Sequence, residues 1–377
     1  MKNPFEYGAI VEADAFCNRQ RELADLNRAI ENGERIFLFG ERRMGKTSLV
    51  KRAMSKLAKN RFIAAYVDLW PTDSEESFIS AFASALTEAA NNTPQKMLEF
   101  ARSFFSRLVP SVTLDAEGKA RIDFTMAGVR EVERTLEDVL SAPMKISKKT
   151  NKQILIVLDE LQQLFEYEDD LVERQLRSSM QQQRGVSYIM LGSRKHLIQK
   201  MLLDKARPLF RAGAHYPLEP ISEEHWLEFI QDRFVQTGKF ITSSQISEIC
   251  TLTQGHPFYT QHLCHALWEL TDEKAHVADE AIGQSLDMVL AREDYAYNAI
   301  WESLTLSQRR LLEGLALDPP QPKIFAAEFL DRYELKSAST AQRAVKGLIE
   351  RDIIDREKDS YQIVDRFFQI WIRRKHE

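Results

Sequence analysis

The length of 377 residues exceeds the roughly 250 to 300 that one hydrophobic core supports, so the chain is expected to form two or three domains. With 44% hydrophobic and 28% charged residues, the composition excludes long disorder and is typical of a globular protein. The net charge of −5 excludes a global positive field for nucleic acids or membranes, so any such binding must be local.

Cysteine usage and hydropathy bear on the cellular localisation of the protein. The three cysteines, Cys17, Cys250 and Cys264, include no C-x-x-C pair and are odd in number, which disfavours a disulfide framework or a structural zinc site. Residues 1–16 contain no apolar run of signal-peptide length, and the longest clearly apolar run, residues 154–158, is too short to span a bilayer. The sequence therefore predicts a cytoplasmic protein that is neither exported nor embedded in a membrane.

The first chemical signal is a phosphate-loop pattern between a predicted strand and a predicted helix. The apolar run at residues 35–39 is typical of a buried parallel strand, and residues 46–58 have the apolar spacing of an amphipathic helix. Between them, residues 40–47 fit the pattern G-x-x-x-x-G-K-T, whose backbone N–H groups converge on phosphate oxygens. Lys46 is expected to reach the β- and γ-phosphates, and the Thr47 hydroxyl to bind Mg²⁺. The nucleotide-binding residues predicted in this loop are Gly40, Arg43, Met44, Gly45, Lys46, Thr47 and Ser48.

Two further apolar runs extend the predicted sheet. Residues 61–70 and 186–193 read as strands, and their alternation with helices indicates an α/β fold, a P-loop parallel sheet with helices on both faces. Ser193 closes the second of these strands, next to the expected position of the acidic motif described below. It is predicted to sense the γ-phosphate through a hydrogen bond, and a cap or turn role is the alternative.

The acidic motif follows the apolar run at residues 154–158. Asp159 and Glu160 stand at the carboxyl end of this buried strand, where a Walker B carboxylate belongs. Asp159 is expected to hold Mg²⁺ through water, and Glu160 to orient and deprotonate the attacking water. An ion pair or a helix cap is the alternative for either acid, because adjacent acids also end ordinary strands.

The stretch of residues 71–150 is longer than one crossover helix requires. Residues 74–90 and 130–142 have helical apolar spacing, and residues 111–124 alternate around Gly118 as in a hairpin. This stretch is either a partner-contacting insertion or a longer covering of the sheet.

The last third of the chain is mostly helical in pattern. Residues 222–298 read as helices, the first of them starting with a capping-box signature at Ser222. Residues 305–352 then read as three helices, and residues 353–364 as a two-stranded wing, an arrangement that resembles winged helix-turn-helix domains.

The third helix of this arrangement is the candidate DNA-reading helix. Its residues Gln342, Arg343 and Lys346 are predicted to face outward, where they would meet phosphates or base edges in a major groove. However, residues 301–377 carry 14 Lys/Arg against 13 Asp/Glu, which is a weak electrostatic footprint for DNA. The alternative is an intramolecular clamp.

Five stretches, in this order, resemble the archaeal-type ATPase family, within the STAND and origin-initiator-like branch of AAA+ proteins. They are residues 16–26, 40–50, 158–165, 191–201 and 253–267, and the paired Arg42 and Arg43 are the most specific local feature. The resemblance covers nearly the whole chain and implies ATP or ADP with Mg²⁺ as ligands. It implies an ATPase domain over residues 1–221 with the insertion at about 71–150, a helical lid over 222–298 and a winged helix over 299–377.

The resemblance also implies roles for residues outside the loop. Phe16, Asn18 and Arg19 would pack beside the adenine, with Asn18 standing where relatives often have glycine. His256 and Pro257 match an element that opens a lid helix near the nucleotide, and Pro257 suits a first helical turn. His256 is expected either to contact the phosphate or base of the nucleotide or to have a structural role at the start of the helix.

An arginine finger completes the transition-state electrostatics in many such ATPases. The candidates are Arg194, Arg207 and Arg211, and Arg211 best resembles the family's arginine. A solvated arginine is the alternative for each.

Three functions are compatible with these features. The first is a nucleotide-operated switch that hydrolyses Mg-ATP slowly, with a lid that converts γ-phosphate loss into hinge motion. The second is an ATP-regulated, DNA-associated regulator or initiator-like protein, whose winged helix binds duplex DNA or a protein partner. A small-molecule kinase also uses a phosphate loop, but the acidic pair suits water activation and the C-terminal segment resembles an interaction module.

Overall fold

The chain forms two compact units in a computed structural model that describes residues 2–8, 16–126, 131–318, 322–357 and 360–376. The core unit comprises Arg19–Arg42 and Lys46–Leu218, and the C-terminal unit comprises Met1–Asn18, Arg43–Gly45 and Glu219–Glu377. Two expected features, the start of a helix at Arg130 and the wing turn at 358–359, lie outside the described residues. No helix in the described part of the chain is long and apolar enough to cross a membrane.

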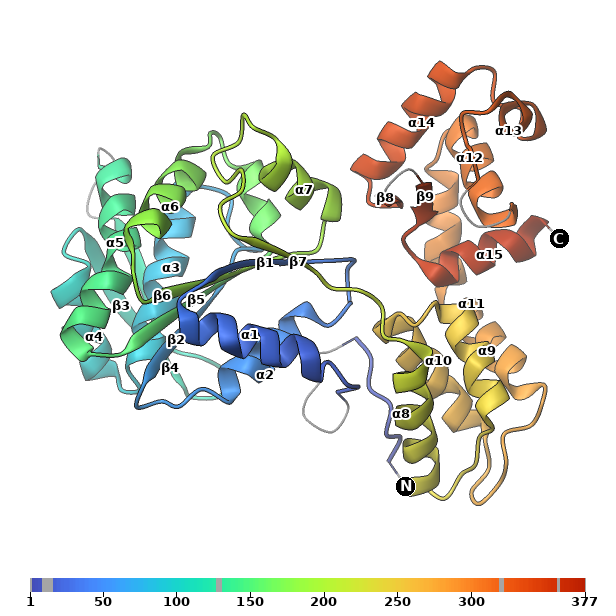
Figure 1. Ribbon diagram of the computed structural model, residues 1–377, viewed down its shortest axis with the longest axis horizontal. Helices are drawn as coiled ribbons and strands as arrows, with labels where there is room; N and C mark the ends of the chain where they lie inside the picture. The colour runs from blue at the N-terminus through green and yellow to red at the C-terminus, as the bar shows by residue number, and fades with distance from the viewer. Residues whose placement is uncertain (1, 9–15, 127–130, 319–321, 358–359, 377) are drawn as a thin grey trace. The chain divides into compact units, whose positions relative to one another are not determined.

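A five-stranded parallel sheet forms the centre of the core unit (Figure 1). Its order is β2-β5-β6-β1-β7. The strands are β1 (Arg35–Phe39), β2 (Phe62–Asp68), β5 (Gln153–Asp159), β6 (Val186–Gly192) and β7 (Ala214–Pro217). The first four match the strands expected from apolar runs, which confirms the α/β P-loop class. The edge strand β7 was missed because only one of its four residues, Tyr216, is even half-buried, so it has no apolar run.

Helices cover both faces of this sheet (Figure 1). The helices on one face are α1 (Gln20–Asn32) and α2 (Lys46–Ser55), and those on the other are α3 (Glu75–Ala90), α5 (Val132–Thr150) and α6 (Leu171–Gln182). Alternate residues of β5, such as Ile154, Ile156 and Leu158, share one buried cluster with residues of α3, α5 and α6. The period of two along each strand therefore divides its apolar side chains between the two helical layers.

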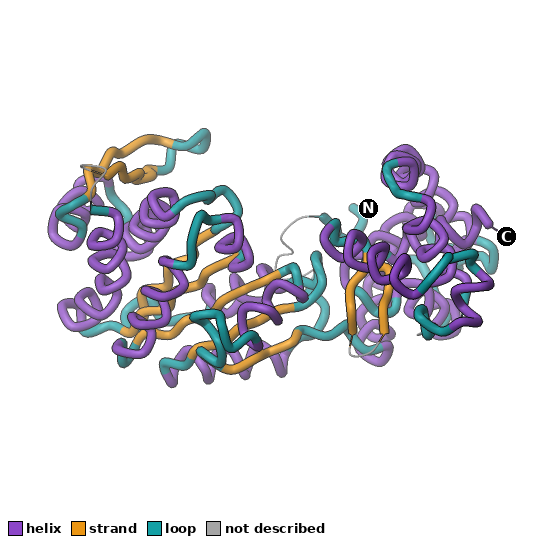
Figure 2. The backbone as a smooth tube through the Cα atoms, turned by 90° about the horizontal axis from the view of Figure 1, so that it is seen from above, coloured by secondary structure: helices purple, strands orange, loops and turns teal. Residues whose placement is uncertain are grey.

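The expected hairpin within residues 71–150 is confirmed and stands apart from the five-stranded sheet (Figure 2). It pairs β3 (Leu108–Leu114) with antiparallel β4 (Ala120–Met126) and follows the short helix α4 (Pro94–Phe104). Phe124 of β4 is buried in the same cluster as α3, and its carbonyl oxygen accepts a 2.8 Å hydrogen bond from Ser80 Oγ. One side of the hairpin is therefore part of the covering of the sheet.

The C-terminal unit contains a helical segment and a winged helix. The helical segment consists of α8 (Glu223–Gln236), α9 (Ser243–Thr253), α10 (Pro257–Leu270) and α11 (Ala281–Glu302). The winged helix consists of α12 (Leu306–Leu317), α13 (Ala327–Arg332), α14 (Ala338–Glu350), β8 (Ile354–Glu357), antiparallel β9 (Ser360–Ile363) and α15 (Arg366–His376). Helix α11 runs through the expected domain boundary between residues 298 and 299, and one buried cluster joins Leu263 to Phe367. The two parts of this unit thus share a core, and the three-domain division stays a prediction.

The N-terminal residues pack within the C-terminal unit. Phe5 is buried in its core, and the carbonyl oxygen of Phe5 lies 2.9 Å from His265 Nδ1 on α10. The Tyr7 ring stacks on His262 of the same helix, with ring centroids 3.9 Å apart. Residues 2–8 therefore belong structurally with the helices that follow the sheet.

The expected capping box at Ser222 is wrong. Ser222 is the N-cap of α8, but its side chain makes no cap bond, and its Oγ lies 2.7 Å from His225 Nδ1 instead. A capping box needs Glu or Gln as the third helical residue, and that position is His225. The two glutamates that suggested the motif occupy the first and second helical positions.

Candidate functional site

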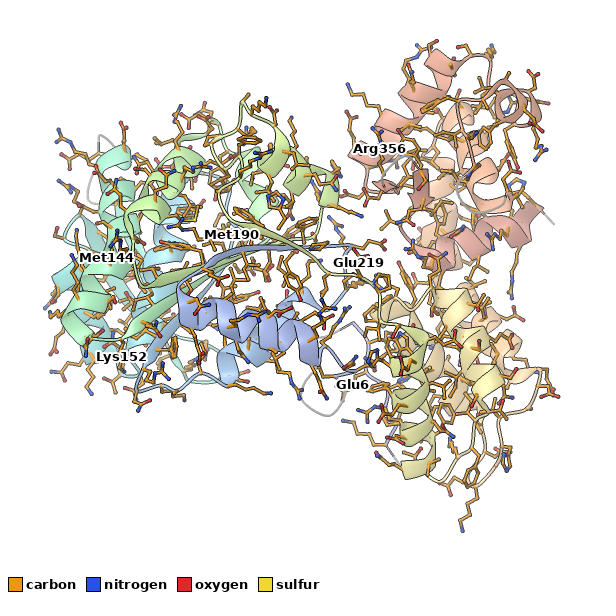
Figure 3. The ribbon with its side chains drawn as sticks, in the orientation of Figure 1. Glu6, Met144, Lys152, Met190, Glu219 and Arg356 are labelled. Atoms are coloured by element: carbon orange, nitrogen blue, oxygen red, sulfur yellow. The ribbon has the colours of Figure 1, made fainter. Side chains whose placement is uncertain are left out.

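The predicted nucleotide-site residues of the core unit gather at one edge of the sheet. The phosphate loop follows β1, Asp159 ends β5, and Ser193 follows β6. Because these strands are parallel and adjacent, their carboxyl ends meet at the same edge. Met190, within β6, lies in the middle of the same sheet (Figure 3).

Lys46 is held against the backbone of its own loop. Its Nζ donates hydrogen bonds to the carbonyl oxygens of Gly40, at 2.9 Å, and Glu41, at 2.6 Å. The side chain is buried, and burial lowers the pKa of Lys46 to about 8, although the nearby charges of Glu160 and Asp159 partly oppose this shift. A buried cation at the start of α2 is thus positioned for an anionic ligand.

The loop glycines have distinct structural reasons. A Cβ on Gly40 would lie 2.8 Å from the carbonyl oxygen of Leu218, so the close approach of the chain after β7 requires glycine. Gly45 has a φ of 83°, which glycine adopts without strain. Arg43 shares this left-handed region with a φ of 61°, and its guanidinium lies 4.2 Å from the centroid of the Phe258 ring within the C-terminal unit.

The predicted Mg²⁺ ligands Thr47 and Asp159 are in direct contact. Thr47 Oγ1 donates a 2.8 Å hydrogen bond to Asp159 Oδ2, and the Glu160 backbone N–H donates at 2.9 Å to Asp159 Oδ1. The hydroxyl of Tyr66, on β2, also donates to Asp159 Oδ2. Burial and the charge of Asp159 raise the pKa of Tyr66, so this phenol stays protonated. Sequence reasoning missed Tyr66, because an aromatic residue within an apolar strand reads as core.

The donor set at this position fits Mg²⁺. Thr47 and Asp159 offer a hydroxyl and a carboxylate, the hard oxygen ligands that this ion prefers. Mg²⁺ is commonly held by one or two carboxylates, with water and substrate phosphates filling its other positions. The described residues include no group of three or more His, Cys, Asp and Glu side chains that would form an all-protein metal cage.

Glu160 and Ser193 are joined by a direct hydrogen bond and also through Gln162. Ser193 Oγ donates a 2.7 Å hydrogen bond to Glu160 Oε2, which also accepts from Gln162 Nε2. Gln162 Oε1 in turn accepts from the Ser193 backbone N–H at 3.3 Å. The expectation that Ser193 lies beside the acidic motif is confirmed, and its γ-phosphate role stays a prediction. Gln162, in the short 3₁₀ helix Leu161–Glu166, gave no signal in the sequence because glutamine there reads as an ordinary solvated residue.

The three candidate arginines have different surroundings. Arg207 forms an ion pair with the buried Glu173, which gives it a structural task. Arg194 NH1 lies 3.9 Å from Glu166 Oε1. Arg211 is exposed, has a φ of 50°, and is anchored through a 3.2 Å hydrogen bond from its backbone N–H to the Leu202 carbonyl oxygen.

The residues expected beside adenine flank the point in the sequence where the C-terminal unit ends and the core unit begins. Phe16 and Asn18 belong to the C-terminal unit, whereas Arg19 begins the core unit. Asn18 and Arg19 have φ values of 48° and 66°. Asparagine is among the few side chains that enter this left-handed region readily, so Asn18 keeps a backbone conformation that glycine would also permit. Arg19 is buried and forms a 2.7 Å ion pair with Glu22.

His256 and Pro257 open helix α10, as expected. Pro257 is its first residue, and His256 is the N-cap, with Nδ1 accepting a 3.3 Å hydrogen bond from the Phe258 backbone N–H. His256 is also buried. This cap bond gives the histidine a structural role, and its contact with a nucleotide stays a prediction.

The outward face of α14 matches the expectation for the third helix of the winged domain. Gln342, Arg343 and Lys346 are exposed, and Lys346 Nζ lies 3.8 Å from Glu350 Oε1 on the same helix. In the wing strand β8, Arg356 is exposed as well (Figure 3). The winged helix therefore presents cations on a helix and on a wing.

Comparison with protein-family models gives two matches. A model described as an ATPase domain predominantly from Archaea matches residues 16–263. A model described as a probable winged helix domain matches residues 295–374. Comparison with curated proteins gave no match at the threshold applied.

Three solved structures illustrate the similarity of the fold. A Walker-type ATPase of Pyrococcus abyssi has a TM-score of 0.64 at 17% identity, over 96% of this chain and 97% of that one. The Aeropyrum pernix ORC2 protein, in ADPNP–ADP complexes, has a TM-score of 0.58 at 12% identity, over 99% of both chains. The Aeropyrum pernix ORC1 protein in complex with DNA has a TM-score of 0.50 at 13% identity, over 96% of this chain and 93% of that one. These likenesses support the fold.

Proposed function

This chain belongs to the family of ATPase domains found predominantly in Archaea, and from this premise we propose that it is a nucleotide-operated switch. Membership makes it an ATP-binding P-loop ATPase. The finer proposal is that it hydrolyses Mg-ATP slowly and that its lid, residues 222–298, and its winged helix, residues 299–377, rearrange with nucleotide state. The observation that carries the catalytic part is the 2.8 Å contact of Thr47 Oγ1 with Asp159 Oδ2, beside the buried Lys46.

Ligand binding is assigned to the loop. Lys46 would exchange its two carbonyl acceptors for phosphate oxygens, which costs little reorganisation because the ammonium is already desolvated. Thr47 and Asp159 would hold Mg²⁺, directly and through water. When bound, the ion neutralises charge on the β- and γ-phosphates and so lowers the barrier to phosphoryl transfer.

Water activation is assigned to Glu160. Its Oε2 already accepts hydrogen bonds from Ser193 and Gln162, which leaves Oε1 to accept a proton from the attacking water. These two hydrogen bonds would hold the Glu160 carboxylate in one orientation toward the attacking water. In this proposal the Ser193 hydroxyl transfers its hydrogen bond to the γ-phosphate, and Arg211 supplies the finger.

The switch is assigned to residues near the adenine side of the proposed site and at the start of α10. The adenine side of the nucleotide would be contacted by Phe16, Asn18 and Arg19. A change in the bound nucleotide would shift α10 through the residues at its start, His256 and Pro257. Phe16 and Asn18 belong to the same compact unit as α10, which supports a common movement.

The test of hydrolysis is Glu160→Gln. This variant should keep its affinity for ATP, whereas the rate of phosphate release should fall by about 100-fold or more, since the general base is lost. The matched control is Glu168→Gln, which changes an exposed acid shortly after the same 3₁₀ helix. Normal hydrolysis by the Glu160 variant would remove this residue from the mechanism.

A second candidate function is ATP-regulated binding of duplex DNA. The exposed Gln342, Arg343 and Lys346 on α14 favour it, and a protein of similar fold, Aeropyrum pernix ORC1, was solved in complex with DNA. The competing assignment for the same face is a protein partner or an intramolecular clamp.

A further inference from the structure

Tyr66 is placed on the carboxylate that the proposed function assigns to Mg²⁺. It lies in β2, the neighbour of β5, and its hydroxyl donates to Asp159 Oδ2, the oxygen that also accepts from Thr47. The strand register pairs Tyr66 with Val157, two residues before Asp159. The phenol therefore reaches along the sheet toward the edge that carries the site.

Helix α2 also contacts the tyrosine ring, through Lys51. Lys51 Nζ lies 4.9 Å from the Tyr66 ring centroid. Lys51 is one helical turn beyond Thr47, so both residues lie on the same face of α2. Tyr66 thus contacts both the helix that starts at the phosphate loop and the aspartate that ends β5.

The hydrogen bonds on Asp159 leave its carboxylate one orientation. Oδ1 accepts from the Glu160 backbone N–H, and Oδ2 accepts from Thr47 and Tyr66. Hydrogen bonds to an ionised carboxylate are stronger than those to a neutral acceptor. Loss of the Tyr66 donor therefore weakens the restraint on the orientation of the Asp159 carboxylate. A carboxylate that holds a metal ion through a water molecule must keep a fixed orientation, because the water has to bind the ion and the carboxylate at the same time.

We propose that Tyr66 is a positioning residue of the Mg²⁺ site, which orients Asp159 from the adjacent strand and acts on the metal without touching it. This inference rests on the proposed function, since it takes Asp159 as the residue that holds the ion. Partners that orient ligands in this way typically change metal affinity by about 10- to 100-fold when they are removed.

The test is Tyr66→Phe, which removes one oxygen atom and keeps the ring. The matched control is Tyr216→Phe, because Tyr216 also donates to an aspartate, Asp25 at 3.0 Å, from another strand of the same sheet. The full chain is titrated with Mg²⁺ while the dissociation constant of ADP is followed with a fluorescent analogue. Thermal unfolding of each variant reports on the fold.

Mg²⁺ should strengthen ADP binding with a half-maximal concentration that is about tenfold higher for Tyr66→Phe than for the wild type. In EDTA the ADP affinity of Tyr66→Phe should be unchanged. Tyr216→Phe should match the wild type in both measurements. An unchanged Mg²⁺ midpoint in Tyr66→Phe, or an equal loss of ADP affinity with and without Mg²⁺, would overturn the positioning role alone. A wild-type protein whose ADP affinity ignores Mg²⁺ would instead overturn the metal assignment of the proposed function.

Discussion

The phosphate-loop edge and the outward face of α14 hold their candidate residues in opposite ways. Lys46 and Asp159 are buried and have polar partners within 2.9 Å. Arg343 and Lys346 are exposed, and the ion pair of Lys346 spans 3.8 Å. A buried charge that loses its partner costs several kcal/mol, whereas exposed ion pairs contribute about 0 to 1 kcal/mol. Substitutions should therefore act strongly and specifically at the loop edge, and weakly and additively on α14.

Lys46→Ala should have the largest effect. It removes the buried cation that faces the phosphates, so the affinity for ATP and ADP should fall by at least about 100-fold, a loss of roughly 3 kcal/mol, as expected for a charge-assisted contact in a dry site. Equilibrium binding of a fluorescent nucleotide measures this. Lys56→Ala, at an exposed lysine just after α2, is the control and should bind normally. Retained nucleotide binding by Lys46→Ala would place the ligand elsewhere.

The lowered pKa of Lys46 gives the next prediction. In the nucleotide-free protein Lys46 loses its proton as the pH rises through about 8, and a neutral amine attracts phosphate weakly. Nucleotide binding must then take up a proton, so ADP affinity should fall by up to about tenfold for each pH unit above 8. Calorimetric titration between pH 7 and pH 9.5, in buffers of different ionisation enthalpy, measures affinity and proton uptake together.

The same pKa shift affects the free energy of unfolding in the opposite direction, so the loss of ADP affinity at high pH does not come from unfolding. The pKa of Lys46 is about 8 in the folded protein and near 10.5 when the side chain is solvated, so between these values the unfolded chain binds more protons. Stability contributed by this group therefore rises with pH across that window. An ADP affinity that stays constant to pH 9.5 would mean that Lys46 does not titrate at the phosphate position.

How much of this could be predicted from the sequence depends on how far apart the interacting residues are along the chain. Lys46 and Thr47 were predicted because the loop chemistry fixes their spacing, and Asp159 because a buried parallel strand reads as a continuous apolar run. The same run placed β5 correctly. Local chemistry thus gave four of the five strands of the sheet and the main polar groups of the site.

The missed residues act over long sequence separations or without an apolar pattern. Tyr66 and Asp159 are 93 residues apart, and no local pattern pairs them. Gln162 meets Ser193 across 31 residues. The packing of Phe5 with α10 was missed for the same reason, since its contact with His265 spans 260 residues. Tertiary packing decides such contacts after the strands have been placed.

The smallest expected effect is on α14. Reversing charge at Arg343 and Lys346 should weaken binding to a mixed-sequence DNA duplex roughly tenfold at about 0.1 M salt, and should reduce the slope of log affinity against log salt by about 2. The measurement is a fluorescence anisotropy titration at several salt concentrations, with the protein loaded with ADP or with a non-hydrolysable ATP analogue. The exposed pair Arg184 and Lys205 of the core unit, reversed in the same way, controls for net charge.

The salt slope separates the two assignments of this face. If α14 meets phosphates, the slope changes only when its own cations are reversed, because each contact releases counterions locally. Equal changes in the Arg184 and Lys205 variant would reflect net charge alone. No binding in either nucleotide state, with occupancy confirmed, would make α14 a clamp or a protein-contact surface and would leave the loop edge as the only ligand site supported by buried, mutually bonded groups among the described residues.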